Sequence, residues 1–285
     1  MKPAPFIYVR AESLEEAVAA LAEHGDEAKI LAGGQSLTPF MNLRLATPEV
    51  LVDINGVSEL EGIAANGSVT IGAVTRQIAV ERSAGVANAA PLVVEALRHV
   101  GHPAVRSRGT LGGTVAHADP SAEIPAVLLA LGGEVVARGP GGERTIAADE
   151  LFVTYFTTAL EDAEVLTSVR IPAATPGMRW GFAELARKHG DFALAGVAAS
   201  AEVDGDGICR SARIALFGVA DRPLRAGAAE QALAGRRLDE AAIRDAERLA
   251  ADGLEPREDV HASSRYRKDV IGVLVRRALT QAAAR

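Results

Sequence analysis

Two glycine pairs, roughly eighty residues apart, limit the folds open to this chain more than any other feature of its sequence. Gly33-Gly34 lies in the segment Leu31–Leu37, directly after a short apolar run, and Gly112-Gly113 lies in the segment Arg108–Thr114. Because glycine has no Cβ, its N–H can approach a ligand closely, and it can adopt positive φ angles that turn successive amides toward an anion. Hydroxyl side chains flank both pairs. Two ordinary turns are the alternative, but together the loops predict a cradle for one long, doubly charged ligand such as a dinucleotide pyrophosphate.

The loops lack the fingerprint of the doubly wound dinucleotide-binding fold. No Gly-x-Gly-x-x-Gly occurs in the sequence, and neither does a phosphate-binding loop that ends in Gly-Lys followed by Ser or Thr. A dinucleotide bound by these loops therefore requires a different fold.

Short helices and strands are expected in mixed order, which is typical of an α+β chain. A strand over Lys29–Ala32 leads into the first glycine loop, and a buried helix over Glu123–Leu131 follows the second. The segment Ala173–Gly177 contains proline, glycine and small residues and predicts a boundary. Beyond it we expect an antiparallel sheet and two amphipathic helices, one over about Ala228–Leu249 with an interruption near Gly235 and one over about Ser264–Ala283.

The composition excludes several kinds of protein. With 4% aromatic residues and a formal charge of −7, the chain lacks the stacking surface and the basic patch of a nucleic-acid-binding protein. Cys209 is the only cysteine, so the chain forms no internal disulfide and holds no iron–sulfur cluster of its own. The six histidines show no metal-ligand spacing, and we expect no metal site. With no stretch as long as a membrane span and no apolar signal region, we expect a cytoplasmic protein.

The residues that surround the two loops are similar to those of a known family. Leu31–Leu37 is followed by Asn42–Arg44 and Val52-Asp53, and Val105–Thr114 is followed by Ala118–Pro120. With these segments in this order, the chain resembles the FAD-binding medium subunits of the molybdenum hydroxylases. Aerobic carbon monoxide dehydrogenase and the xanthine- and nicotinate-type dehydrogenases contain such subunits. The resemblance runs from the first ten residues nearly to the end of the chain.

The resemblance implies a two-subdomain FAD-binding fold of the PCMH or vanillyl-alcohol-oxidase type, over residues 1–57 and 58–175. It also implies a C-terminal α+β domain over residues 176–285, of the kind found in carbon monoxide dehydrogenase flavoproteins, with an antiparallel sheet and helices. FAD would lie between the two subdomains, and both glycine loops would hold its pyrophosphate with amides and hydroxyls. The cofactor-binding residues implied are Ile30, Leu31, Ala32, Gly33, Gly34, Gln35, Ser36, Leu37, Gly101, Thr110, Leu111, Gly112, Gly113, Thr114, Glu123, Leu166 and Lys188.

Four of these residues lie outside the loops. Glu123 matches an acidic ligand of the cofactor's sugar chain, where a carboxylate accepts two hydroxyl donors; compensation of charge at a helix N-terminus is the alternative. Gly101 matches a position that touches the flavin or its chain, and Leu166 matches an apolar flavin contact. Lys188 lies where a basic side chain could approach the ring, although some relatives carry their basic residue where this chain has Ala183-Glu184.

Three further residues near the second loop have two interpretations each. His117 is a packed loop histidine or a covalent flavin attachment point, and noncovalent binding in the family favours the first. Arg106 and Arg108 neutralise phosphate or dock a partner, or they are plain surface residues.

The resemblance implies an oxidoreductase subunit rather than a complete enzyme. A partner large subunit would hold the molybdenum cofactor, a partner small subunit would hold iron–sulfur clusters, and FAD on this chain would pass electrons to an external acceptor, in a dimer of heterotrimers. No catalytic acid, base or nucleophile is expected on this chain. The alternatives are a self-sufficient flavin-dependent reductase or oxidase of the same fold, and an assembly scaffold that has lost FAD. The substrate of the complex and its terminal acceptor stay open.

Overall fold

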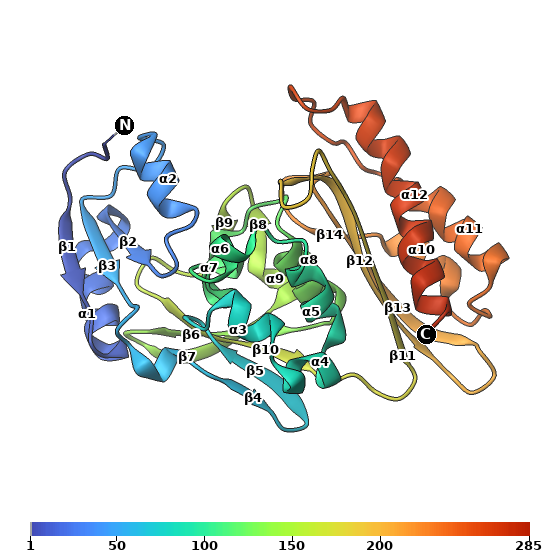
Figure 1. Cartoon of the computed structure of the whole chain (residues 1–285), viewed down its shortest axis with the longest axis horizontal. Coiled ribbons are helices and arrows are strands. Elements are labelled where there is room, and N and C mark those ends of the chain that lie inside the picture. The colour runs from blue at the N-terminus through green and yellow to red at the C-terminus, as the bar shows by residue number, and fades with distance from the viewer. Residues whose placement is uncertain (1) are drawn as a thin grey trace.

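Three main sheets follow one another along the long axis of the molecule (Figure 1). The computed structural model describes residues 2–285. The α+β class expected from the sequence is confirmed, because the chain forms separate sheets, parallel and antiparallel, with mostly short helices packed beside them. Within residues 2–285, no helix combines the length and the hydrophobicity that crossing a membrane requires.

The first sheet is parallel and brings its loops to one edge. Its strands are β1 (Ile7–Arg10), β2 (Ala28–Leu31) and β3 (Val50–Asp53), with β3 in the middle. Helix α1 (Leu14–His24) covers it and begins at Ser13, whose hydroxyl accepts a hydrogen bond from the backbone of Glu16 as a capping residue should. Since the carboxyl ends of parallel strands meet at one edge, the loops after β2 and β3 lie beside each other.

The second sheet is antiparallel and has the order β4-β5-β10-β6-β7. Its strands are β4 (Ile63–Ala65), β5 (Ser68–Gly72), β6 (Glu134–Gly139), β7 (Gly142–Ala147) and β10 (Val165–Pro172). Strands β4 and β5 form one hairpin and β6 and β7 another, and Gly67 has the positive φ of 78° that the turn of the first hairpin requires.

Short helices cover one face of the second sheet (Figure 1). They are α3 (Gln77–Glu81), α4 (Ala84–Ala89), α5 (Pro91–Leu97), α6 (Pro103–Arg106), α7 (Leu111–His117), α8 (Glu123–Ala130) and α9 (Ala148–Leu151). This half of the chain also contains α2 (Leu37–Asn42), after the first glycine loop, and a two-stranded ribbon of β8 (Phe152–Thr154) and β9 (Thr157–Thr158). Two short 3₁₀ turns lie at Gly25–Glu27 and Ser58–Leu60.

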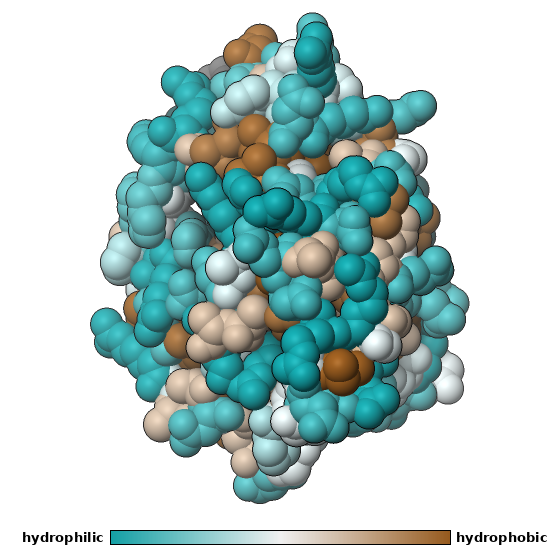
Figure 2. Space-filling view, turned by 90° about the vertical axis from the view of Figure 1, so that its right-hand side faces the viewer, coloured by the Kyte–Doolittle hydropathy of each residue, from teal (hydrophilic) through white to brown (hydrophobic). Residues whose placement is uncertain are grey.

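The third sheet is antiparallel and lies between two layers of helices (Figure 1). Its strands are β11 (Met178–Ala186), β12 (Ala193–Val203), β13 (Cys209–Phe217) and β14 (Leu224–Arg225). One face is covered by α10 (Gly227–Leu233), α11 (Glu240–Leu249) and α12 (Ser264–Ala283), and α8 packs against the other. Figure 2 shows that the outer face of this end is mainly hydrophilic, with apolar residues gathered toward its upper end.

The small side chains of β12 let both faces of the third sheet pack closely. Ala195, Val197 and Ala199 belong to the apolar core under α10–α12, whereas Ala198 belongs to the core shared with the second sheet. A Cβ at Gly181 in β11 would lie 1.9 Å from the carbonyl oxygen of Ala278, so α12 approaches this strand at a distance that only glycine allows.

Candidate functional site

The two glycine loops touch each other through their backbones. A Cβ on Gly33 would lie 2.5 Å from the carbonyl oxygen of Arg108 and 2.8 Å from the Cα of Gly109. A Cβ on Gly113 would lie 2.6 Å from the hydroxyl of Thr110 and 3.9 Å from the Cβ of Ala32. The structure therefore brings together the two segments that the sequence placed roughly eighty residues apart.

The first loop presents a row of unpaired backbone donors. Among residues 2–285, no backbone or side-chain acceptor pairs with the N–H groups of Gly33, Gly34, Gln35 and Ser36. Gly34 has a φ of +69°, which turns the chain between strand β2 and helix α2. Successive free amides at a positive-φ glycine form a concave anion site. This loop supplies the donors that a pyrophosphate needs.

Most backbone N–H groups of the second loop already donate hydrogen bonds within the protein. The N–H groups of Leu111 and Gly112 donate to the carbonyls of Thr75 and Ala73, and that of Gly113 donates to the Thr110 hydroxyl. Thr110 is thus the N-cap of α7. What the second loop has left for a ligand is its backbone shape and the Thr114 hydroxyl.

Two residues that sequence reasoning missed join the loops. Arg76 donates from Nη1 to the carbonyl of Arg108 at 2.7 Å and from Nη2 to the Asn55 side chain at 2.8 Å. Asn55 in turn donates from Nδ2 to the carbonyl of Ala32 at 2.8 Å. Asn55 lies two residues after Asp53, the last residue of β3, and its backbone N–H donates to the Asp53 carboxylate. Asp and Asn this close together are a turn signal that the sequence shows, whereas nothing local in the sequence marks Arg76.

A groove of about 400 Å³ lies over the contact between the loops. Arg108 forms its basic side and has no acidic partner within residues 2–285, so its charge is available to an anion. Thr38 and Asn42 of α2 also line the groove. The other lining residues are Gly33, Gly34, Gln35 and Pro39.

A buried acidic cluster lies beyond the second loop, at the start of α8. Glu123 is 7% exposed, and burial together with the charge of Glu184 raises its pKa to about 8. Burial also raises the pKa of Glu184, on β11, to about 7. Oε2 of Glu184 lies 3.9 Å from Nδ1 of His99, whose pKa is lowered by burial. Sequence reasoning singled out Glu123 but neither of its neighbours.

Three further predicted residues lie outside the glycine loops and apart from one another in the sequence. Gly101 lies against the loop between β11 and β12, because a Cβ on Gly190 would come 2.8 Å from the Gly101 carbonyl oxygen. Lys188, in the same loop as Gly190, is exposed, and its Nζ lies 3.7 Å from Asp191. Leu166 is buried in the core of the second sheet.

His117 packs in a cluster of rings. Its ring centroid lies 5.4 Å from that of Phe40 and 5.1 Å from that of Phe156. Burial lowers its pKa, so the neutral form is favoured. Packing of this kind agrees with the interpretation of His117 as a packed loop histidine. Arg106 likewise has a structural role, since it is buried and pairs with Glu81 at 2.8 Å.

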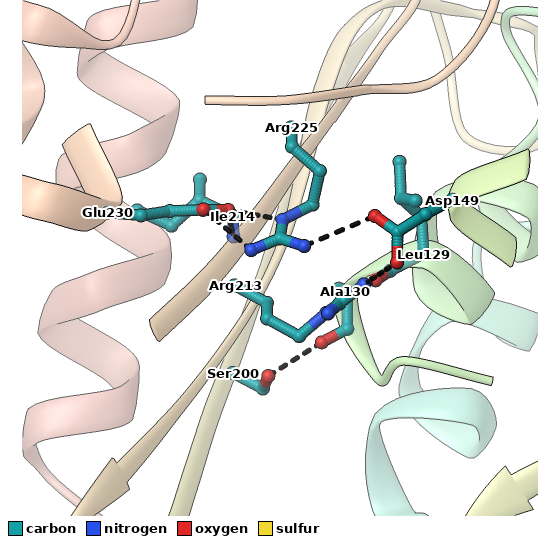
Figure 3. Close-up of polar contacts among 8 residues, drawn as sticks. All are labelled: Leu129, Ala130, Asp149, Ser200, Arg213, Ile214, Arg225 and Glu230. Atoms are coloured by element: carbon teal, nitrogen blue, oxygen red, sulfur yellow. Dashed lines mark hydrogen bonds and ion pairs between the residues drawn. The ribbon is translucent and has the colours of Figure 1, made fainter. Parts of the chain in front are cut away.

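Helix α8 is held between the domains by a polar network (Figure 3). Arg213 on β13 donates from Nε to the carbonyl of Leu129 at 3.0 Å and also pairs with Asp149 of α9. Ser200 on β12 donates to the carbonyl of Ala130 at 2.7 Å. These contacts satisfy carbonyls at the end of α8 and so fix the helix whose first residue is Glu123.

The donors and acceptors in this region match the parts of FAD. The free amides of the first loop and the Arg108 guanidinium match a pyrophosphate. The buried carboxyls of Glu123 and Glu184 match hydroxyl donors of a sugar chain, and Oε2 of Glu184 lacks a partner among the described residues. The chemistry present therefore fits the pyrophosphate and the hydroxylated sugar chain of a dinucleotide such as FAD.

Two family models cover nearly all of the chain. The model described as the FAD binding domain in molybdopterin dehydrogenase matches residues 4–174. The model described as the CO dehydrogenase flavoprotein C-terminal domain matches residues 180–282.

Full-length relatives show the same similarity. The chain is 41% identical to the 6-hydroxypseudooxynicotine dehydrogenase complex subunit alpha of Paenarthrobacter nicotinovorans, with 99% of this chain and 96% of that protein covered. It is also 41% identical to the carbon monoxide dehydrogenase medium chain of Hydrogenophaga pseudoflava, with 100% and 99% covered. The solved carbon monoxide dehydrogenase from that organism, in a form lacking the Mo-pyranopterin moiety, superimposes with a TM-score of 0.97 at 42% identity, with 100% and 99% covered.

Proposed function

We propose, because the chain belongs to the family of FAD-binding subunits of molybdopterin dehydrogenases, that it carries FAD and passes electrons through it within an oxidoreductase complex. The observation that carries the proposal is the row of four free amides from Gly33 to Ser36, set against the backbone of the second loop. When bound, FAD accepts electrons singly and delivers them in pairs.

The residues of this chain would bind and orient the cofactor. The first loop and Arg108 would hold the pyrophosphate, and Thr110 and Thr114 would support it from the second loop. Glu123 would accept hydroxyl groups of the sugar chain, while Gly101 and Lys188 would lie near the ring. Leu166 is buried in the core of the second sheet, so it would support the ring indirectly, through the residues packed on it.

The electrons would come from partner chains. The relatives are named as subunits or chains of dehydrogenases, and this chain has a single, buried cysteine. We therefore propose a large subunit with the molybdenum cofactor and a small subunit with iron–sulfur clusters as partners, in a dimer of heterotrimers. The large subunit would determine the substrate. The cytoplasmic location stays a prediction.

The test is the absorption spectrum of the chain purified alone, with identification of any cofactor that heat releases. We expect released, noncovalent FAD. A colourless chain that does not bind added FAD would contradict the proposal, and flavin that stays attached after denaturation would favour a self-sufficient oxidase with a covalent link at His117.

A pair of glycine variants tests the assignment of the loops. In Gly33→Ala the new methyl group meets the backbone of Arg108 and Gly109, so the loops must separate, and we expect at least about a tenfold loss of FAD affinity, or about 1.4 kcal/mol. The matched control is Gly141→Ala, where a Cβ has no neighbour within 4 Å. Equal FAD affinity in both variants would refute the loop assignment.

A further inference from the structure

A second hollow, of about 250 Å³, lies between the two domains, and none of its lining residues belongs to the glycine loops. The FAD-binding domain contributes Tyr155 and Phe156, from the turn of the β8–β9 ribbon. The C-terminal domain contributes Phe192 and, from the loop between α11 and α12, Arg257 and His261. The hollow therefore exists only when both domains are in place.

The rim of this hollow exposes large apolar side chains to solvent. Phe192 is 71% exposed, and Val260, which lies between two residues that line the hollow, is 95% exposed. Tyr155 and Phe156 are exposed as well. The loop between α11 and α12 stands at the top of the C-terminal domain in Figure 1, and Figure 2 shows apolar residues gathered at the upper end of that side. Exposed apolar side chains are common singly, but a group of them marks an interaction surface.

Two guanidinium groups stand beside the apolar rim. Cζ of Arg257 lies 5.4 Å from the centroid of the Tyr155 ring, and Nη1 of Arg187 lies 3.3 Å from Nδ1 of His261. Both arginines are exposed, and within residues 2–285 neither forms an ion pair with a carboxylate. Their charges and most of their hydrogen-bond donors are thus available to a partner.

The acidic groups of the hollow offset these arginines only in part. Asp259 pairs with the buried Arg267 at 2.7 Å. Asp119 is half-buried, and one of its oxygens accepts a hydrogen bond from the backbone N–H of Ser121 at 2.8 Å. The glutamates of the loop between α11 and α12 do not line the hollow. The lining and the arginines beside it therefore carry more positive than negative charge, although the chain has a formal charge of −7.

Helix α7 connects this surface to the second glycine loop. Thr110 of that loop is the N-cap of α7, and the ring of His117, the last residue of α7, lies 5.1 Å from the ring of Phe156. A helix of seven residues is about 10 Å long. A protein that docks on this surface would therefore lie close to the loops that hold the cofactor.

We propose that the hollow and its apolar rim are the docking surface for a partner subunit of the oxidoreductase complex, whose matching face presents an apolar anchor surrounded by carboxylates. Aromatic side chains and arginine are the residues that dominate binding at protein interfaces. A second copy of this chain fits less well, because a symmetric contact would place the same unpaired arginines against each other. The proposal deepens the proposed function and rests on it, since that function requires partner chains.

The experiment measures binding of the full chain, loaded with FAD, to the subcomplex of its partner subunits by sedimentation velocity. In Arg257→Glu a like charge faces the carboxylates of the partner, so we expect the affinity to fall by at least about tenfold. Raising the NaCl concentration from about 0.05 to 0.5 M should weaken wild type more than this variant. The matched control is Arg277→Glu, an exposed arginine on α12, which should bind as wild type does.

Phe192→Ala tests the apolar part of the surface. Loss of this exposed ring should lower the affinity by at least about tenfold. Because Phe192 and Arg257 are both exposed, the two variants should keep the wild-type melting temperature, which separates lost docking from misfolding.

Hydrogen exchange gives a readout that needs no variant. In the assembled complex, the backbone amides of Tyr155, Phe156 and Phe192 should exchange at least about tenfold more slowly than in the chain alone. The exposed turn at Gly141-Gly142 is the control and should exchange at the same rate in both.

Three outcomes would count against these inferences. Wild-type affinity in both Arg257→Glu and Phe192→Ala, without protection of the amides, would overturn the docking surface and leave the proposed function intact. Self-association of the chain that either variant abolishes would assign the surface to a second copy, and would overturn the proposal as well. Wild type that carries FAD but binds no partner chain would instead contradict the proposed function.

Discussion

At the scale of single residues, the missing side chain of Gly33 decides how close the two loops can come. Its Cα faces the carbonyl of Arg108 at a distance that no Cβ permits, and Arg76 and Asn55 fasten the same backbone segments with their side chains. A glycine supplies room, and the two polar side chains then hold the segments in place. Both are needed, because backbone approach alone provides little attraction.

Also at this scale, Glu123 and Glu184 should make the stability of the cofactor-free chain depend on pH. Their pKa values, raised to about 8 and about 7 from 4.5, mean that the folded state holds more protons than the unfolded state between about pH 5 and 8. The stabilisation is therefore full below about pH 4.5, falls as the pH rises from there, and is lost once the pH has passed through 7 and 8. We expect the melting temperature to fall by about 5 °C or more from pH 6 to 8.5.

The double variant Glu123→Gln, Glu184→Gln is the control for this pH dependence. Neither amide ionises, so the fall in melting temperature on the alkaline side should be much smaller. Calorimetric scans of both proteins in a set of buffers measure it. A wild-type melting temperature that rises between pH 6 and 8.5 would contradict the assignment of the buried carboxyls.

At the scale of elements, α8 is the helix that joins the two halves of the molecule. It is apolar on all sides, with every residue from Glu123 to Ala130 buried, and it packs on β12 and β13 as well as on α5. Apolar packing alone would let it slide along the sheet. The carbonyls of Leu129 and Ala130 accept from Arg213 and Ser200, which fixes its position along the axis.

Asp149 of α9 is the shared acid of the network in Figure 3. Partial burial acts to raise its pKa, but the hydrogen bond from Arg213 and the charges of Arg213 and Arg225 lower it overall. In Asp149→Ala both arginines lose this partner. Because the groups are partly exposed, we expect a loss of only about 1 kcal/mol in unfolding free energy.

Limited proteolysis of the segment between the domains, near Ala173–Gly177, gives a second readout, and cleavage should be faster in Asp149→Ala. The control is Asp269→Ala, which removes an exposed pair with Arg265 at 3.8 Å. If both variants are cleaved at the wild-type rate, the network does not hold the domains together.

At the scale of the whole molecule, one apolar core crosses the domain boundary. Phe182, Ala198 and Phe217 of the third sheet belong to the same cluster as the core of the second sheet. The C-terminal domain is thus part of the structure that supports α8, and not an independent attachment. We expect the chain to unfold in a single cooperative transition.

Phe217→Ala tests this shared core. Phe217 is fully buried, so truncation should lower the free energy of unfolding by about 3–5 kcal/mol. The chain should still unfold in a single transition. Phe192→Ala is the control, since Phe192 is 71% exposed and its truncation should leave the transition in place. Two separate calorimetric transitions, with only one moved by Phe217→Ala, would mean that the domains unfold independently.

The local pattern of the sequence was sufficient to predict where several helices and strands lie. The helices over Ser264–Ala283 and Glu123–Leu131 and the strand over Lys29–Ala32 all lie within a residue of where the sequence predicts them. These features depend on side chains within a few positions of one another, through capping, periodicity and turn preference. The subdomain boundaries at residues 57 and 175 and the cofactor-binding role of each residue stay predictions.

By itself the sequence determined that two glycine loops exist, that they carry hydroxyl groups, and that an acid follows the second loop. Only the tertiary structure decided that Gly33 meets Arg108, that the amides of Leu111 and Gly112 are already used, and that Glu123 and Glu184 are both buried. The physical reason is distance along the chain. Backbone geometry follows from neighbouring residues, whereas a desolvated pair of charges arises only when packing brings two remote elements together.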